Sequence, residues 1–263
     1  GSLRSIVNWK LFYALYETKF HLNAMSDEKI FIKKIHNQNN VKTIFLYFSS
    51  TEELIKKNFR DNFTRVNYVY LNYDFFVSDE ISIKLFKLQK TKVGKYIKIG
   101  NIGADIINAN EDEHLLKINK LKINISNNKK ILSFFDHSIG RDGVWNQLDY
   151  NLFFKKILLV IRKYKYEIIY KSKKNKNELF KNFSEENRKL FYEILKFNNF
   201  TYLDGKNKKL SAYQIIAMSD LIISAPVSSI ISETLSASKK ILVYDPNGKY
   251  KSKHFFINKI SEF

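Results

Sequence analysis

From residue 129 onward, short apolar runs alternate with longer segments whose apolar residues recur at helical spacing. Short apolar runs are typical of strands buried on both faces, and the helical spacing is typical of helices with one buried side. The predicted strands are Ile131–Phe135, Glu167–Tyr170, Phe200–Leu203, Leu221–Ile223 and Ile241–Tyr244. The predicted helices cover residues 147–165, 184–197, 211–217 and 227–235. Strands joined by helices run parallel, so the pattern predicts a doubly wound parallel α/β domain over residues 129–250.

The first half of the chain shows the same alternation less regularly. Helices are expected over residues 3–20, from Ser26 and over 78–88, and extended segments over 42–48, 65–71, 74–77 and 96–99. These elements predict a companion Rossmann-like domain over residues 3–110, short or truncated. Residues 106–128 are polar and rich in asparagine, which is typical of a linker. Residues 251–263 are expected to form a C-terminal helix or tail.

The net charge of the 263-residue chain is +19, which by itself suggests a negatively charged partner. The lysines are spread along the chain apart from the run at 171–176, and asparagine, isoleucine, phenylalanine and tyrosine are abundant with them. This distribution indicates a general compositional bias and disfavours nucleic acid. A nucleotide donor and an anionic membrane surface both remain open as partners.

The chain has no cysteine, so disulfides and cysteine-ligated metals are excluded. The five histidines show no metal-binding spacing, and the sequence carries no signature of an organic cofactor. No uncharged apolar run reaches the roughly 18–20 residues that a membrane span needs. We therefore expect a cytoplasmic protein, at most peripheral to the inner face of the cytoplasmic membrane.

Polar residues follow each predicted strand of the second half, at the edge where parallel sheets bind ligands. Asp136 and His137 follow the first strand, Lys171 the second and Asp245 the fifth. Lys171 has two interpretations: it neutralises a donor phosphate, or it is a solvated lysine at the end of a strand. For Asp136 and His137 the alternatives are catalysis and the structural pairing of a buried polar group.

After the fourth strand, Pro226, Ser228 and Ser229 lead into the next predicted helix. The two serines either cap that helix or bind a phosphate at its positive end. Glu233 lies one turn further on, where it either binds ribose hydroxyls or complements the helix dipole.

The loop after the first strand carries a second candidate for phosphate binding. Gly140 and Gly143 flank Arg141 and Asp142 directly after that strand. Glycine permits close approach of the backbone to a ligand, and arginine can bind a phosphate or carboxylate through two donors. The spacing is neither GxGxxG nor a P-loop, so it does not support ATP or NAD.

The string SDLIISAPVSSIISETLSASKKILVYDPNG at 219–248 resembles the nucleotide-binding domain of bacterial surface-polysaccharide glycosyltransferases of the GT-B class. The matching residues are Asp220, Pro226, Ser228, Ser229, Tyr244, Asp245, Pro246 and Gly248. The segments ILSFFDHS and EIIYKSK are also similar to this group. Ser228-Ser229 resembles the serine pair that holds the cytidylate phosphate in CMP-sugar transferases, which include the polysialyltransferases and β-Kdo transferases. Sialyltransferases carry a His-Pro motif, whereas here Ser172 follows Lys171.

The resemblance implies a GT-B fold and a metal-independent glycosyltransferase. Its donor would be a nucleotide sugar, with a CMP-activated ulosonic acid such as Kdo favoured. Its acceptor would be a glycan or glycolipid of capsule or lipopolysaccharide. The alternatives are a UDP- or GDP-sugar transferase, a nucleotide-sugar epimerase of the same fold, and a non-catalytic basic module that binds anionic membrane or nucleic acid.

A glycosyltransferase needs a base for the acceptor hydroxyl or a carboxylate nucleophile beside the anomeric carbon. Asp136 ranks first, because a carboxylate at the end of a buried strand is costly unless it is used or paired. His137 is the candidate proton carrier. Asp79 is the rival from the first half of the chain, and Asp142 ranks third because Arg141 beside it is a ready ion-pair partner.

Overall fold

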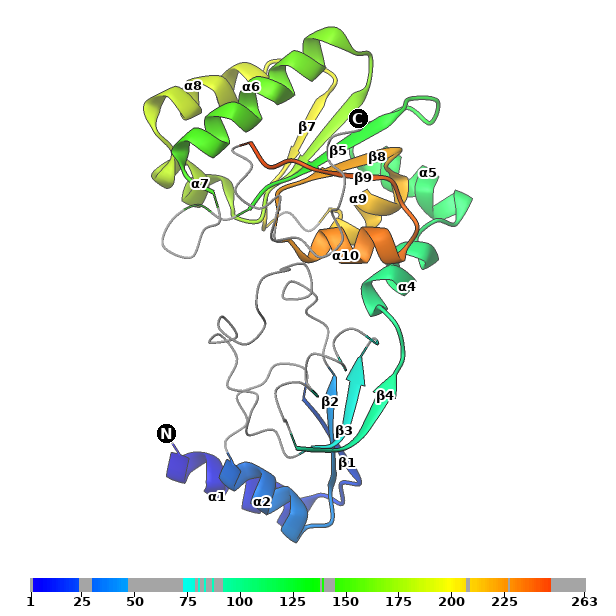
Figure 1. The fold of residues 1–263 in the computed structure, drawn as a ribbon, viewed down its shortest axis with the longest axis vertical. Coiled ribbons are helices and arrows are strands. Elements are labelled where there is room, and N and C mark those ends of the chain that lie inside the picture. Colours follow the sequence, from blue (N-terminus) through cyan, green and yellow to red (C-terminus); the bar gives the residue numbers. More distant parts are fainter. Residues whose placement is uncertain are drawn as a thin grey trace. The chain divides into compact units, whose positions relative to one another are not determined.

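The computed structural model describes residues 2–23, 30–46, 73–78, 80, 83, 87, 92–137, 139, 145–206, 209–226 and 228–246. The chain divides into two compact units, residues 1–102 and 103–263 (Figure 1). The site candidates Asp79, Gly140, Arg141 and Asp142 lie outside the described residues, as do Gly143 and Gly248. So do the segment 65–71, most of 78–88 and the tail 251–263.

The first unit contains a four-stranded parallel sheet in the order β1-β2-β3-β4. Its described elements are α1 (Ser2–Leu15), β1 (Phe20–Asn23), α2 (Ile30–Gln38), β2 (Lys42–Leu46), β3 (Tyr73–Ser78) and β4 (Val93–Lys98). The predicted helix over 3–20 is confirmed as far as Leu15, and the strands corresponding to β2, β3 and β4 are confirmed. Strand β1 was not predicted, because its pairing with β2, Phe20 opposite Lys42, is a contact between distant segments.

The second unit contains a five-stranded sheet in the order β7-β6-β5-β8-β9, with every pair parallel. Its strands are β5 (Ile131–Phe135), β6 (Glu167–Lys171), β7 (Phe200–Leu203), β8 (Leu221–Ser224) and β9 (Ile241–Val243). Its helices are α4 (Ile102–Ala109), α5 (Glu113–Lys122), α6 (Gln147–Lys163), α7 (Lys176–Asn182), α8 (Glu185–Ile194), α9 (Ala212–Met218) and α10 (Ser229–Ser236). The predicted doubly wound sheet is confirmed, and so is the position of each strand.

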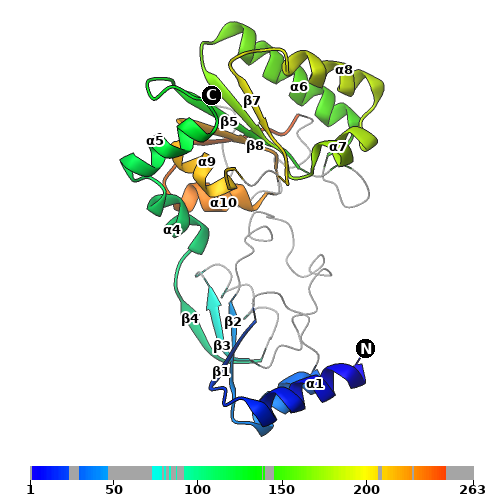
Figure 2. The same ribbon diagram turned by 180° about the vertical axis from the view of Figure 1, so that it is seen from behind.

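Helices cover both faces of this second sheet (Figures 1 and 2). Leu132 and Phe134 of β5 belong to the core that includes residues of α6 and α8. Ile131 and Phe135 belong to the core that includes residues of α9. Because successive side chains of a strand point to opposite faces, β5 supplies both cores, which explains its unbroken apolar run.

The helix ends follow local sequence rules. Ser211 and Gln214 form the predicted capping box of α9, and the Ser184 hydroxyl accepts the Asn187 N–H at the start of α8. Asn146 and Asp149 form a second capping box on α6. These caps fix where each helix leaves the sheet edge. Within the described ranges, no helix combines the length and apolarity that crossing a bilayer requires.

The prediction that residues 106–128 form a polar linker is wrong. They hold the end of α4 and all of α5, which the Asp112 carboxylate caps through the N–H groups of His114 and Leu115. Ile107, Ile123 and Ile125 are buried in the same core as α9. A few isoleucines among many polar residues suffice here because the helices need only one narrow buried side.

Candidate functional site

The strand order of the second sheet reverses between β5 and β8, which are neighbours in the sheet but distant in sequence. The chain leaves these two strands in opposite directions, and ligands of doubly wound sheets bind at such a point. The Ala225 N–H donates to the Phe135 carbonyl at 2.9 Å, and the Tyr244 N–H donates to the Ser224 carbonyl at 2.8 Å. These bonds align the carboxyl ends of β5, β8 and β9. The topology therefore gathers Asp136, Pro226 and Asp245 at one edge, as predicted.

Ser228 occupies the N-cap position of α10 with extended backbone, but its side chain makes no capping hydrogen bond. In the same unit, Ser184 and Ser211 at the N-caps of α8 and α9 do cap their helices through their hydroxyls, so Ser228 differs from both. Ser228 and Ser229 are half-buried, and the preceding Pro226 is buried. The Ser228 hydroxyl is thus not used to start the helix, and it lies where a helix N-terminus favours an anion.

Glu233 lies one turn into α10 and is only 7% exposed. Burial raises the pKa of its carboxyl, and the Tyr213 hydroxyl of α9, which donates to it at 3.4 Å, acts in the opposite direction. A carboxylate placed only to complement the helix dipole would be solvated. This one lies between α9 and α10 and accepts a hydrogen bond from Tyr213, so it does more than complement the dipole, and its contact with ribose hydroxyls stays a prediction.

Asp136 is 5% exposed, and its carboxylate accepts three hydrogen bonds. The donors are the Tyr170 hydroxyl at 2.6 Å, the Lys173 N–H at 2.7 Å and the Tyr150 hydroxyl at 3.2 Å. Burial raises the pKa of Asp136 to about 6, against the opposing effect of these donors. The pairing accounts for a carboxylate at the end of a buried strand. Its catalytic role stays a prediction.

The other strand-end residues are also engaged. His137 is 8% exposed, and its carbonyl accepts a hydrogen bond from the Tyr150 hydroxyl. The Lys171 ammonium donates to the Asp204 carbonyl at 2.6 Å, and burial lowers the pKa of Lys171. Lys171 is therefore not a freely solvated lysine at a strand end.

Sequence reasoning missed the three tyrosines around these groups, Tyr150, Tyr170 and Tyr202. Burial raises the pKa of each of their hydroxyls. The only signal in the sequence was a hydroxyl-bearing Tyr170 inside a buried strand, where a polar group usually has a partner.

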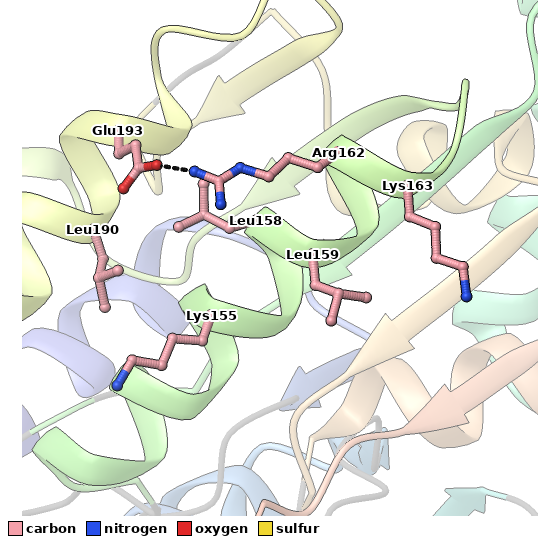
Figure 3. A pocket seen from close by; sticks show the side chains of 7 residues that line it. All are labelled: Lys155, Leu158, Leu159, Arg162, Lys163, Leu190 and Glu193. Atoms are coloured by element: carbon pink, nitrogen blue, oxygen red, sulfur yellow. Dashed lines mark hydrogen bonds and ion pairs between the residues drawn. The ribbon is translucent and has the colours of Figure 1, made fainter.

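A groove of about 610 Å³ lies elsewhere on this unit, between α6 and α8. It is lined by Lys155, Leu158, Leu159, Arg162, Lys163, Leu190 and Glu193 (Figure 3). Arg162 and Glu193 form an ion pair across it. The groove follows the C-terminal halves of both helices, which lead into the amino ends of β6 and β7. It therefore lies toward the sheet edge opposite to the site. No group of three or more acidic or histidine side chains in the described ranges is arranged to hold a metal ion.

Solved structures that are similar to the chain include a polymerase, an epimerase and a glycosyltransferase. The wall teichoic acid polymerase TagF, H444N variant, matches with a TM-score of 0.57 at 12% identity, covering 88% of this chain and 56% of that one. The UDP-GlcNAc 2-epimerase from Neisseria meningitidis matches with 0.56 at 15% identity, covering 89% and 62%. A glycosyltransferase from Rickettsia africae matches with 0.51 at 16% identity, covering 96% and 64%. The chain thus spans between 56% and 64% of the length of these proteins, and the likeness shows the fold alone.

The fold is the GT-B fold of these glycosyltransferases and epimerases, and its two parallel sheets confirm the predicted class. The sequence matches the family described as polysaccharide biosynthesis PFTS motif protein over residues 2–261, and the chain belongs to that family. No curated protein matches the chain.

Proposed function

We propose that this chain is a glycosyltransferase of polysaccharide biosynthesis that binds a nucleotide-sugar donor at the carboxyl edge of its second sheet. One observation carries the proposal: Ser228 sits at the N-cap of α10, at the strand-order reversal, and its hydroxyl does not cap the helix. The family match, which spans residues 2–261, includes this site and supports a role in polysaccharide biosynthesis. A UDP-GlcNAc molecule is bound in the similar epimerase.

In the proposed complex the hydroxyls of Ser228 and Ser229 and the first amides of α10 bind the donor phosphate. Glu233 accepts hydrogen bonds from the ribose hydroxyls. Lys171 adds positive charge, and Pro226 sets the direction in which the chain enters α10. Gly140, Arg141 and Asp245 complete the proposed donor site from the loops after β5 and β9. Cations and amides stabilise the leaving phosphate in this scheme, so the reaction needs no metal.

The catalytic assignment stays as predicted from the sequence. Asp136 is proposed as the base, with His137 as proton carrier and Asp79 as the rival. A pKa of about 6 lies close to what a general base needs at neutral pH. The three donors on its carboxylate argue for a positioning role instead. The two roles are separated by the Asp136 and Tyr170 variants described below.

The donor is proposed to be CMP-activated, with a ulosonic acid such as Kdo favoured, and the acceptor to be a glycan or glycolipid of capsule or lipopolysaccharide. The serine pair supports this choice through its resemblance to CMP-sugar transferases. UDP- and GDP-sugars are the alternative donors. An epimerase is the second candidate, favoured by the likeness in fold to the epimerase from Neisseria meningitidis. Release of free sugar and nucleotide without any acceptor would favour it.

Calorimetric titration of the full chain with CMP, UDP and GDP tests the proposal. At least one nucleotide should bind below millimolar concentration. The double variant Ser228→Ala/Ser229→Ala should weaken that binding at least about tenfold, since each charge-assisted hydrogen bond is worth roughly 1.5–3 kcal/mol. Ser236→Ala, at the exposed far end of the same helix, is the matched control and should leave affinity unchanged. Absence of binding by all three nucleotides, or full affinity in the double variant, would refute the donor site.

A further inference from the structure

The loops after β6 and β7 are locked together, which their distance in sequence does not reveal. The Gly205 N–H donates to the Lys174 carbonyl at 2.9 Å, and the Lys171 ammonium donates to the Asp204 carbonyl at 2.6 Å. A Cβ atom added at Gly205 would lie 2.4 Å from the Lys173 carbonyl oxygen. Only glycine fits at this contact, so the two loops form one continuous surface.

Hydrogen bonds to buried polar groups hold the backbone of this surface in place. The Lys173 N–H donates to the Asp136 carboxylate at 2.7 Å. The buried Ser172 hydroxyl donates to the Lys174 carbonyl at 2.5 Å and lies 3.0 Å from the Tyr202 hydroxyl. The backbone is therefore fixed by buried polar groups, and the loops present their side chains from a rigid base.

The side chains on this base are lysines, and we call them the lysine shelf: Lys173, Lys174, Lys176, Lys206 and Lys209. Of these, Lys173, Lys176, Lys206 and Lys209 are exposed. Glu178 forms an ion pair with Lys174 at 2.7 Å. The Asp204 carboxylate accepts the N–H groups of Lys206, at 2.9 Å, and Lys176, at 3.4 Å. The segments 173–178 and 204–209 carry six lysines and two carboxylates, Glu178 and Asp204, so the shelf keeps a net positive charge.

The composition of the shelf restricts its ligand. Single-stranded nucleic acid is usually held by exposed aromatic rings as well as by cations. The aromatic residues beside the shelf are half-buried and pack against the core: Tyr202 has its hydroxyl beside Ser172, and Phe180 lies under the Lys176 ammonium. A membrane-binding surface adds exposed apolar residues to its cations. Among the described residues of 171–182 and 204–210, none of the exposed side chains is apolar. Lysine ammonium groups on a fixed backbone suit oxyanions spaced along a polar chain.

We infer that the lysine shelf is a binding site for an anionic glycan, one that carries phosphate or carboxylate groups along its length. The shelf lies on the same carboxyl edge of the sheet as Ser228 and Ser229, on the β6–β7 side of the strand-order reversal. The bound glycan is then the acceptor or the growing product of the transferase, and this part of the inference rests on the proposed function. Binding of the anionic glycan does not depend on it.

Calorimetry on the full chain with four probes tests the shelf: octagalacturonate, a short linear polyphosphate, neutral maltooctaose, and vesicles of phosphatidylserine and phosphatidylcholine. The shelf variant is Lys173→Glu/Lys206→Glu. Lys156→Glu/Lys163→Glu, on exposed positions of α6, is the control with the same change in net charge. The two anionic oligomers should bind and maltooctaose should not. The shelf variant should lose at least about tenfold in affinity and the control less than about threefold, with weaker salt dependence only in the shelf variant.

Nucleotide affinity separates this inference from the proposed function, because neither the shelf variant nor the control changes Ser228, Ser229 or Lys171. Unchanged nucleotide binding with lost oligomer binding supports the shelf as a separate site. Equal losses in both double variants would show a general charge effect and overturn it. Loss of vesicle binding without any oligomer binding would assign the shelf to a lipid surface. Loss of nucleotide affinity in the shelf variant would place these lysines in the donor site instead.

Discussion

In each of the two parallel sheets a buried or half-buried aspartate joins neighbouring segments, Asp74 in the first and Asp136 in the second. The pKa values of these two carboxyls are shifted in opposite directions. In the first sheet, Asp74 of β3 accepts hydrogen bonds from the Thr43 N–H at 2.7 Å, the Thr43 hydroxyl at 2.8 Å and the Lys33 ammonium at 2.9 Å. Burial tends to raise the pKa of Asp74, but the Thr43 N–H, Lys33 and the Thr43 hydroxyl outweigh it and lower the pKa to about 2. In the second sheet, burial raises the pKa of Asp136 to about 6.

The number of donors does not explain the difference, because each carboxylate accepts three hydrogen bonds. Asp74 has a 35% exposed side chain and an ammonium group among its donors. Asp136 is 5% exposed and receives its bonds from two phenols and one amide. A cation and residual solvent favour the ionised form, whereas neutral donors in an apolar core do not fully replace water. The comparison shows that the setting of a carboxylate, more than its hydrogen-bond count, decides its charge.

The largest expected effect is that of Asp136→Asn. The amide cannot accept all three donors, so the free energy of unfolding of the second unit should fall by about 2 kcal/mol. If Asp136 is the base, turnover should also fall at least about a hundredfold. Donor turnover, measured where the variant is still folded, and denaturant unfolding give the two readouts.

Tyr170→Phe is the matched control, because it removes the 2.6 Å hydrogen bond and keeps the carboxylate. It should lose a similar amount of stability and keep turnover within about tenfold of the wild type. Equal losses of turnover in the two variants would make Asp136 a positioning residue, and the search for the base would move to Asp79.

The second prediction concerns pH and uses the one tryptophan of each unit, Trp9 and Trp145, as separate reporters. Asp136 binds its proton more tightly when folded, so the second unit should lose on the order of 3 kcal/mol of stability as pH rises from about 4 to 6. Asp74 binds its proton less tightly when folded. Its stabilisation of the first unit is complete above about pH 4 and should be lost as pH falls toward 2.

Fluorescence-detected unfolding of the Trp9→Phe and Trp145→Phe chains between pH 2 and 8 measures how the free energy of unfolding of each unit changes with pH. Asp136→Asn should remove this pH dependence from the second unit alone, and Asp74→Asn should remove it from the first unit alone. Stability that changes with pH in the same direction in both units would contradict the comparison of the two carboxyls.

The smallest expected effect is that of Lys33→Met in α2, which removes the cation beside Asp74 and keeps most of the side-chain volume. Because Asp74 is partly exposed, the first unit should lose only about 1 kcal/mol. The loss of stability of the first unit in acid should also begin at a higher pH, since the pKa of Asp74 returns toward its ordinary value. Lys34→Met, on the exposed side of the same helix, should change neither quantity. If the first unit of Lys33→Met loses stability in acid at the same pH as the wild type, the Thr43 hydrogen bonds alone cause the low pKa of Asp74.

The sequence determined the regular part of this protein. The five strands of the second unit, the caps at Ser184 and Ser211, and the parallel arrangement follow from apolar periodicity and short-range hydrogen bonding, which neighbouring residues along the chain decide. Because parallel strands end at one edge, the sequence also placed Asp136, Lys171, Ser228 and Asp245 at the same edge of the sheet.

Tertiary structure alone decided how those residues are used. Asp136 is paired with hydroxyls 14 and 34 residues away, and Gly205 joins two lysine-bearing loops that no local pattern connects. The segment 106–128 looked like a linker because its three buried isoleucines are few along the sequence and become part of a core only where they pack with α9 and its neighbours. Local sequence patterns show which residues avoid water. The groups that bury each of them and bond to it come from distant segments of the chain, and these contacts decide the burial and the charge of the residues at the site.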